Sequence, residues 1–242
     1  MFETAEPVVK RKQGVPVSST FGNEAPAAFT QLDFPLAATP RSRRAQYRFK
    51  RWLDIAVAGG LLILLSPLML TIAIAVKVGS RGPILFRQQR LMQEGVEFTL
   101  FKFRTMVDGA DAMLDKVFVL NEASAPLFKA RKDPRLTRVG CVLRKSFFDE
   151  LPQLINVLRG EMSLVGPRPI LTREISTLAG RVAFRFGVPQ GITGPWQTHG
   201  HHGLNFEEQL AIERSYIANW SLRKDLAILL KTVQLVLLRR GI

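Results

Sequence analysis

The distribution of hydrophobic and polar positions sets one long apolar stretch apart from the rest of the chain. Residues Ile55 to Val76 contain no charged side chain. Their length is close to the roughly 20 residues that span the hydrocarbon core of a bilayer as a helix. The pattern therefore predicts a helix embedded in a membrane, and an ordinary membrane-spanning helix is its simplest form.

Two features of this segment also fit a second arrangement. Basic residues flank it on both sides, and both flanks would prefer the cytoplasmic face of a membrane. Ser66 and Pro67 lie near its middle, where proline bends a helix and serine can satisfy freed backbone groups in lipid. The residues alone leave open a kinked spanning helix or a re-entrant hairpin that breaks at Ser66 and Pro67. The flanking basic residues are Arg41, Arg43, Arg44, Arg48, Lys50, Arg51, Lys77, Arg81, Arg87 and Arg90.

The segments that follow change from helical to strand-like patterns. Residues Ile84 to Gln88 and Phe98 to Phe103 are short, apolar and aromatic, and Gly95 lies between them. They are typical of two strands joined by a turn. Residues Asp108 to Leu120 show helical spacing, and Pro126 to Pro134 has the composition of a loop. We therefore expect a small β-hairpin followed by a helix and a loop.

A further helix is expected to start between Ser146 and Pro152 and to run to about Leu158. Ser146 precedes Asp149 by three residues, which resembles a capping box, and proline is tolerated near a first helical turn. The segment Leu164 to Pro169, LVGPRP, is expected to lack regular structure because of its glycine and prolines.

The last part of the chain predicts an amphipathic helix from Asn219 onward. Apolar residues recur there at spacings of three and four, which places them on one helical face. Such a helix can lie in the membrane interface or pack on the protein's own core, and it can support a homodimer. The apolar positions are Leu222, Leu226, Leu229, Val233, Val236 and Leu237.

Composition completes the predicted organisation. Five prolines and many small polar residues make a disordered tail of residues 1–45, without the pattern of a secretory signal. We expect residues 46–80 to form the basic flank and the membrane segment, and residues 81–242 to form a small cytoplasmic domain with interfacial helices. The expected class is α+β, mainly helical. One cysteine, Cys141, excludes an internal disulfide.

The net charge of +14 indicates an anionic partner: nucleic acid, an anionic lipid surface or a phosphorylated substrate. Within this basic chain, Asp149 and Glu150 form an adjacent acidic pair at a predicted helix start, where a structural cap is the commoner role. Cations surround the pair in sequence, and arginine can grip phosphate through two hydrogen bonds. A carboxylate pair among phosphate-binding groups indicates phosphoryl transfer. The surrounding cations are Lys102, Arg104, Arg144, Lys145 and Arg168.

From about Lys50 to the C-terminus, the sequence resembles the monotopic bacterial sugar transferases that prime polysaccharide and glycan synthesis. Several motifs in the family's order carry the resemblance. They are KFRTM at Lys102 to Met106, DPRLTRVG at Asp133 to Gly140, DELPQL at Asp149 to Leu154, NVLRGEMSLVGPRP at Asn156 to Pro169, Trp196 with Gln197, and NWSL at Asn219 to Leu222.

The resemblance implies a transfer of sugar 1-phosphate from a UDP-sugar to polyprenyl (undecaprenyl) phosphate at the bacterial inner membrane, on its cytoplasmic face. Asp149 would attack the β-phosphorus, expel UMP and form an aspartyl-phosphate sugar adduct, which the lipid phosphate then attacks. Glu150 would bind Mg²⁺ together with Asp149. Ser66 and Pro67 match the family's helix break, which favours the re-entrant hairpin. The implied substrate-binding residues are Lys102, Arg104, Asp133, Arg135, Arg144, Pro167, Arg168 and Pro169.

The sequence departs from the family most clearly after Trp196, where His199, His201 and His202 stand in a glycine-rich loop. Three histidines without cysteines or fixed helical spacing are weak evidence for a metal site, so substrate contacts or a solvated loop are the alternatives. The departure leaves the donor sugar unpredicted. A membrane-tethered scaffold or an anionic-lipid or nucleic-acid binding protein is the competing interpretation, although no nucleic-acid motif is found.

Overall fold

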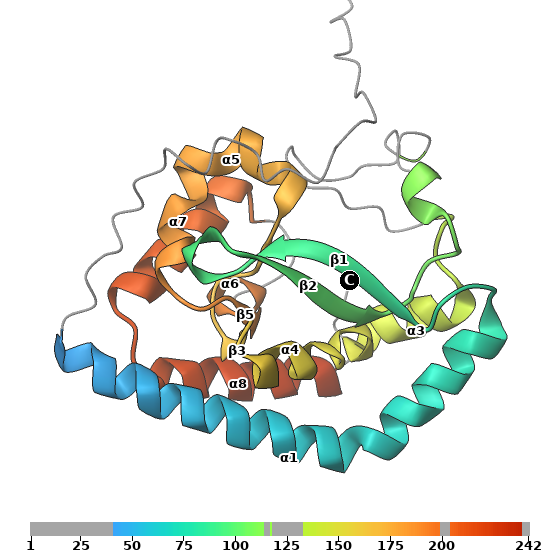
Figure 1. Cartoon of the computed structure of the whole chain (residues 1–242), viewed down its shortest axis with the longest axis horizontal. Helices are drawn as coiled ribbons and strands as arrows, with labels where there is room; N and C mark the ends of the chain where they lie inside the picture. The colour runs from blue at the N-terminus through green and yellow to red at the C-terminus, as the bar shows by residue number, and fades with distance from the viewer. Residues whose placement is uncertain (1–40, 114–116, 118–132, 199–203, 239–242) are drawn as a thin grey trace, which may run out of the picture. The chain divides into compact units, whose positions relative to one another are not determined.

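The computed structural model describes residues 41–113, 117, 133–198 and 204–238 (Figure 1). This part of the chain is mainly helical and carries two small sheets, which confirms the predicted α+β class. Residues 1–40 of the predicted tail lie outside the described residues. Residues 41–45 belong to a helix, so the tail predicted for residues 1–45 is five residues too long.

The long apolar segment forms helix α1, Arg41–Gly79, with Pro67 inside it. The helix continues through Ser66 and Pro67, and its axis bends (Figure 1). The Ser66 hydroxyl donates to the carbonyl of Ile63 at 2.8 Å, and the Thr71 hydroxyl donates to that of Pro67 at 2.9 Å. Such back-bonding is typical of polar side chains in bent apolar helices. The predicted helix break is thus a bend within one continuous helix.

The predicted β-hairpin is confirmed. Strands β1, Leu85–Leu91, and β2, Glu97–Phe103, pair antiparallel, so the first strand extends three residues beyond the expected end. The turn η2, Gln93–Gly95, places both Glu94 and Gly95 at positive φ, 64° and 72°. Two such residues reverse the chain tightly. Strand β4, Ile170–Leu171, pairs with the edge of β1 opposite β2, so β1 is the central strand in the order β2-β1-β4.

The segment before the acidic pair differs from the prediction. Helix α3, Arg138–Ser146, starts at the Thr137 cap and ends at Ser146, whose hydroxyl donates back to the carbonyls of Val142 and Leu143. The predicted capping box at Ser146 is therefore wrong. A 3₁₀ turn, η5, Phe148–Glu150, follows, and α4, Gln153–Arg159, begins only after it.

The segment predicted to be irregular contains a short strand. Strand β3, Ser163–Val165, pairs parallel with β5, Gly191–Thr193. Close backbone approach explains the glycines beside this pair, because a Cβ on Gly191 would lie 2.1 Å from the nitrogen of Gly166. The irregular part is thus limited to residues 166–169. The other short elements are η3 (Ala110–Met113), η6 (Thr172–Glu174), α5 (Ile175–Val182), η7 (Ala183–Gly187) and α6 (Pro195–Thr198).

Helix α7, Phe206–Ala218, begins at a capping box of Asn205 and Glu208. Helix α8, Leu222–Leu237, begins at Ser221 and confirms the predicted C-terminal helix. The predicted helix of residues 108–120 is described only in part, as the short turn η3, because residues 114–116 and 118–120 lie outside the described residues.

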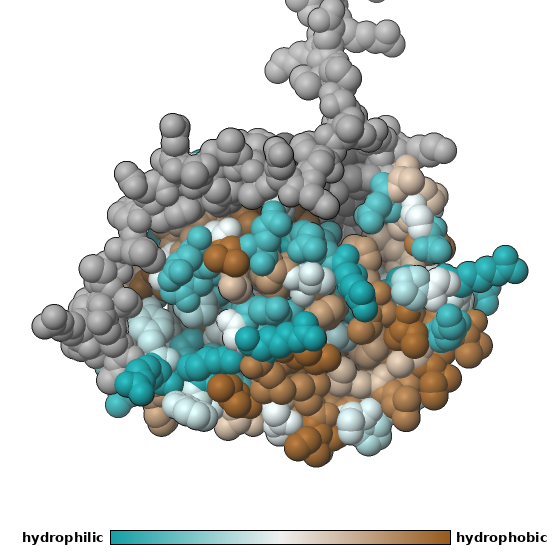
Figure 2. All heavy atoms as spheres, in the orientation of Figure 1, coloured by the Kyte–Doolittle hydropathy of each residue, from teal (hydrophilic) through white to brown (hydrophobic). Residues whose placement is uncertain are grey.

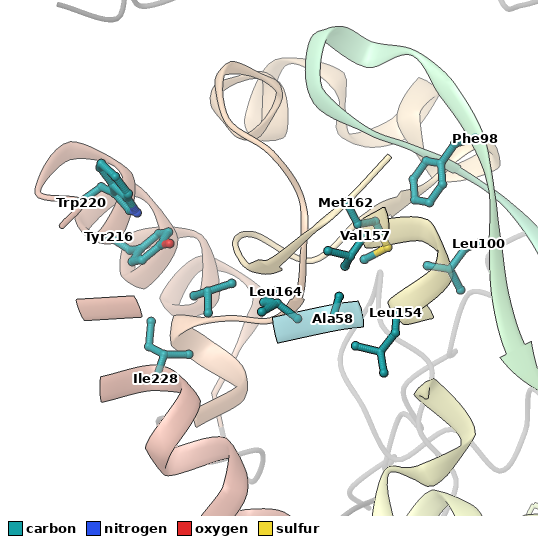
Figure 3. Packing of buried hydrophobic residues seen from close by; sticks show 11 residues of the cluster. Ala58, Phe98, Leu100, Leu154, Val157, Met162, Leu164, Tyr216, Trp220 and Ile228 are labelled. Carbon is teal, nitrogen blue, oxygen red and sulfur yellow. The ribbon is translucent and has the colours of Figure 1, made fainter. Parts of the chain in front are cut away.

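The core joins elements from the whole domain (Figure 3). Side chains of α4 and the hairpin cluster with Ala58 of α1 on one side of the core, and Tyr216, Trp220 and Ile228 lie on the other side. A buried polar network also connects these parts. Lys50 contacts Asp225 at 2.6 Å, and the Tyr216 hydroxyl donates to the same carboxylate at 2.6 Å.

Helices α1 and α8 expose apolar side chains to the outside, and hydrophobic residues gather over α1 on the face shown in Figure 2. Of the described helices, α1 alone is long and apolar enough to cross a membrane, and only 11% of its most apolar window is buried. A core helix would be mostly buried. We define the apolar face as Ile63, Leu64, Leu70 and Ile74 of α1 with Leu226, Leu230, Val233 and Leu237 of α8.

Candidate active site

The 3₁₀ turn η5 carries the acidic pair into the interior of the domain. Phe147, between α3 and this turn, adopts a left-handed backbone conformation with φ 60°. That conformation is costly for a bulky side chain. It reverses the chain immediately before Asp149, whose exposed fraction is 8%. A strained turn thus holds a charged residue where water has little access.

Glu150 joins three separate segments. Its Oε1 atom lies 2.5 Å from Nζ of Lys102 on β2 and 3.5 Å from Nη2 of Arg168, in the loop between β3 and β4. The predicted Glu150, Lys102 and Arg168 are therefore brought together. Both cations contact Oε1 of Glu150, so these two ion pairs do not use its other carboxylate oxygen, Oε2.

Burial and charge separate the two carboxyl groups. Burial raises the pKa of Asp149 to about 6, and the neighbouring Glu150 adds to this shift while Lys102 opposes it. Burial also acts to raise the pKa of Glu150, but Lys102 and Arg168 outweigh it and lower that pKa to about 2. Burial in turn lowers the pKa of Lys102, although Glu150 opposes this. Asp149 is thus a high-energy carboxylate beside a stable ion pair.

Two backbone contacts fix the loop that carries Arg168. The nitrogen of Gly191 donates to the carbonyl of Pro167 at 2.9 Å, and Nη1 of Arg90 donates to that of Pro169 at 2.6 Å. The prolines restrict the backbone between these points. Pro167 and Pro169 therefore position Arg168, and their side chains carry no charge to bind phosphate themselves.

Glu213 on α7 supports the same loop. Its side chain is fully buried, forms an ion pair with Arg185 and accepts a hydrogen bond from the nitrogen of Arg168 at 3.4 Å. Burial raises the pKa of Glu213, while Arg185 opposes the shift. A buried charge is tolerated only when it is paired and hydrogen-bonded, so this ion pair is part of the support of the site.

The side chains of Arg90, Lys102, Glu150, Gln153 and Arg168 line one pocket. Its remaining wall is formed by Leu100, Pro169, Gly191 and Ile192. The pocket combines cationic donors with apolar surface.

Three of the predicted substrate-binding residues have structural partners elsewhere. Asp133 and Arg135 are buried against each other, with 2.7 Å between Oδ2 and Nη2. Nη2 of Arg104 donates to the carbonyl of Ser80 at 2.8 Å, after the end of α1. Arg144 lies close enough to Asp149 and to Asp133 for its charge to lower the pKa of each carboxyl group.

Sequence reasoning missed Arg90, Gln153 and Glu213. Gln153 belongs to the DELPQL motif, which was its only signal, while Arg90 stands out in the sequence only as part of a basic flank. Glu213 had no signal, because an acidic residue within a helix is normally solvated. His199, His201 and His202 lie outside the described residues.

A sequence model of the family described as "Bacterial sugar transferase" matches residues 45–239. The match covers every element described above except the first four residues of α1. The chain belongs to the bacterial sugar transferase family. The match confirms the resemblance inferred from the motifs.

Individual bacterial sugar transferases show the same relationship. The exopolysaccharide production protein ExoY of Rhizobium meliloti is 39% identical over 196 residues, which are 79% of this chain and 87% of ExoY. A UDP-glucose:undecaprenyl-phosphate glucose-1-phosphate transferase of Caulobacter vibrioides is 42% identical over 215 residues, 84% of this chain and 75% of the relative. The UDP-galactose-lipid carrier transferase of Erwinia amylovora is 36% identical over 239 residues, 97% of this chain but 49% of that protein.

Proposed function

We propose that this chain transfers a sugar 1-phosphate from a UDP-sugar to undecaprenyl phosphate, as the first membrane step of exopolysaccharide or glycan synthesis. The observation that carries the proposal is the buried Asp149 beside the Glu150 ion pair with Lys102 and Arg168. Family membership and the names of the relatives support the same reaction class. The relatives include transferases named for glucose and for galactose, so they leave the sugar open.

Asp149 is the proposed nucleophile. Because its carboxylate is poorly solvated and has a pKa near 6, it is ionised at neutral pH but retains an unusually reactive charge. Its oxygen would form a bond to the β-phosphorus while the bond from that phosphorus to the UMP oxygen breaks. The lipid phosphate oxygen would then attack the same phosphorus, and the Asp149 carboxylate would leave unchanged.

Lys102, Arg168 and Arg144 are proposed to hold the diphosphate of the donor. Arg168 suits this role because its loop is fixed on both sides by Arg90 and Gly191. A guanidinium held in this way can bind phosphate oxygens in pairs. Asp133, Arg135 and Arg104 would instead act on the fold that supports these cations.

The carboxylates of Asp149 and Glu150 fit a Mg²⁺ ion that substrate phosphates help to bind. Mg²⁺ commonly uses one or two protein carboxylates with phosphate oxygens and water. Among the described residues there is no group of three or more acidic, histidine or cysteine side chains that could hold a metal without substrate. When bound, the ion would supply positive charge against the leaving phosphate.

We also propose that α1 is a re-entrant hairpin in the inner membrane, with the catalytic domain on the cytoplasmic face. Lys50 and Arg51 join the first part of α1 to Asp225 and to the carbonyl of Val157, both at 2.6 Å. Arg104 joins the chain just after α1 to the same domain. A straight helix with both ends tied to one domain could not cross a bilayer, and the apolar face would enter one leaflet.

The release of UMP tests the reaction. Purified protein in detergent or nanodiscs should release UMP from at least one UDP-sugar when undecaprenyl phosphate and Mg²⁺ are present. Asp149→Asn should abolish release, since an amide cannot form the adduct. With radiolabelled donor and no lipid acceptor, wild type should retain label on the protein and Asp149→Asn should not. Absence of UMP release by wild type with every donor would favour the non-catalytic alternatives.

Cysteine labelling tests the hairpin independently. Cys141 is exposed, so the background is Cys141→Ser. Single cysteines replace the exposed Arg48 and Arg81, which lie on either side of the apolar segment. A membrane-impermeant maleimide should label both in inside-out vesicles and neither in intact spheroplasts. Labelling of the two positions from opposite sides would establish a spanning helix instead.

A further inference from the structure

Gln153 is a buried polar residue that the proposed reaction does not use. It is the first residue of α4 and its exposed fraction is 3%. Its side chain lines the pocket that Lys102, Glu150 and Arg168 also line. Within the described part of the chain, its amide group forms no hydrogen bond, and it is not among the fully enclosed unpaired groups, so it stays open to the pocket.

An amide group has two N–H donors and a carbonyl acceptor, and burying it without partners is costly. The neighbouring buried amide of Asn156 shows the usual outcome. Its nitrogen donates to Thr99 and Glu161 at 2.8 and 2.6 Å, and its oxygen accepts from Phe101 at 3.1 Å. Since buried polar groups are normally satisfied, an amide left open at a pocket wall requires an explanation.

Gln197 also lacks hydrogen-bond partners for its amide among the described residues, but protein atoms enclose that amide completely and it does not line the pocket. Gln153 is therefore the one of the two that can meet a molecule in the pocket.

The surrounding groups indicate what this molecule offers to Gln153. Lys102 and Arg168 carry only donors, so they suit phosphate oxygens, whereas Arg90 donates to Gln88 and to the carbonyl of Pro169. Leu100 and Ile192 supply apolar surface, which suits the carbon face of a sugar ring. A hydroxyl group both donates and accepts hydrogen bonds and would satisfy the amide, whereas phosphate oxygens can only accept from it.

We infer that Gln153 binds a hydroxyl group of the transferred sugar. The inference rests on the proposed transfer of a sugar 1-phosphate, since it places the sugar beside the phosphate that the cations hold. Binding of the hydroxyl would satisfy the carbonyl oxygen and an N–H group of Gln153 that have no partner in the protein.

The test combines Gln153→Leu with singly deoxygenated donors. The leucine side chain has a similar size but forms no hydrogen bond. Using the UDP-sugar that wild type prefers and its 2-, 3-, 4- and 6-deoxy analogues, kcat/KM is measured for UMP release. For wild type, one analogue should fall at least about tenfold below the parent donor, because it leaves a buried amide unpaired. In Gln153→Leu, the parent donor should fall to a similar level and that difference should disappear.

Gln209→Leu is the matched control, since Gln209 is a buried amide on α7 that donates to the carbonyl of Leu204 at 3.3 Å. It should preserve the wild-type pattern among donors. Gln153→Asn shortens the side chain but keeps the amide, and it should retain part of the discrimination. It also provides the measurement if Gln153→Leu does not fold, as judged by thermal unfolding.

Two results would overturn the inference while the proposed function stands. One is an equal loss with the parent and all deoxy donors in Gln153→Leu, which would assign Gln153 to phosphate or to the fold. The other is an unchanged pattern in that variant. If wild type released no UMP with any donor, the proposed function would be overturned together with this inference. That outcome is distinguished from the other two because it needs no variant.

Discussion

Replacing the proposed nucleophile should make the protein more stable at neutral pH. The pKa of Asp149 is raised from its ordinary value of 3.8 to about 6 in the folded protein, chiefly by burial. A carboxyl group with a raised folded pKa favours folding while it is protonated. Its ionisation opposes folding increasingly as the pH rises from about 4 to about 6. Asp149→Asn removes this penalty and keeps the shape of the side chain.

The size of the effect follows from the shift. It amounts to about 2 pH units, and each unit corresponds to about 1.4 kcal/mol. Above pH 6, Asp149→Asn should therefore be more stable than wild type by ~3 kcal/mol at most. For a protein of this size, 1 kcal/mol changes Tm by about 2 to 4 °C. We expect a gain of several degrees at pH 7.5 that vanishes below pH 4.

The assay is thermal unfolding in detergent with EDTA, so that no divalent cation shifts the pKa of Asp149. Asp133→Asn is the control with the opposite sign. The Arg135 guanidinium lowers the pKa of Asp133, so this variant should lose stability at pH 7.5 and lose less at low pH. A destabilised Asp149→Asn at pH 7.5, or a gain that is equal at pH 4 and pH 7.5, would refute the reasoning.

Three further outcomes are expected. In wild type, kcat/KM for UMP release should fall about tenfold per pH unit below pH 6, because Asp149 must be ionised to attack; a profile flat down to pH 5 would contradict this. Glu213→Gln, which removes the charge beneath the Arg168 loop, should raise the donor KM about tenfold, whereas Glu207→Gln in an exposed ion pair should leave it unchanged. Gly191→Ala would place a Cβ 2.1 Å from a backbone nitrogen and should cost about 1 to 3 kcal/mol in urea unfolding. Gly187→Ala, whose Cβ meets nothing within 4 Å, should be nearly neutral by comparison.

The elements with a strong local pattern could be predicted from the sequence. The hairpin of β1 and β2 follows from two aromatic-rich segments around Gly95, and α8 follows from apolar spacing alone. The acidic pair could be identified, but its environment could not. The left-handed conformation of Phe147 has no sequence signature, and without it Asp149 would continue a helix rather than enter the interior.

Charged residues in motifs were the least predictable part of the site. Lys102 and Arg168 contact Glu150. Asp133 and Arg135 instead pair with each other, and Arg104 donates to the carbonyl of Ser80. A motif shows that a residue type is needed, but the tertiary contacts decide whether it serves the fold or the site. For Gln153 the relevant observation is its position in the wall of a pocket, which depends on tertiary structure.

The ion pair between Lys50 and Asp225 has a consequence for the synthesis of the protein. The two residues are 175 positions apart, so at roughly 5 to 20 residues per second the ribosome makes Asp225 about 10 to 35 s after Lys50. For most of that interval α1 is complete, but Lys50 lacks its ion-pair partner. A polypeptide that ends before residue 225 would contain every proposed catalytic residue and would still tie α1 to Val157 through Arg51, but Lys50 would lose its ion-pair partner.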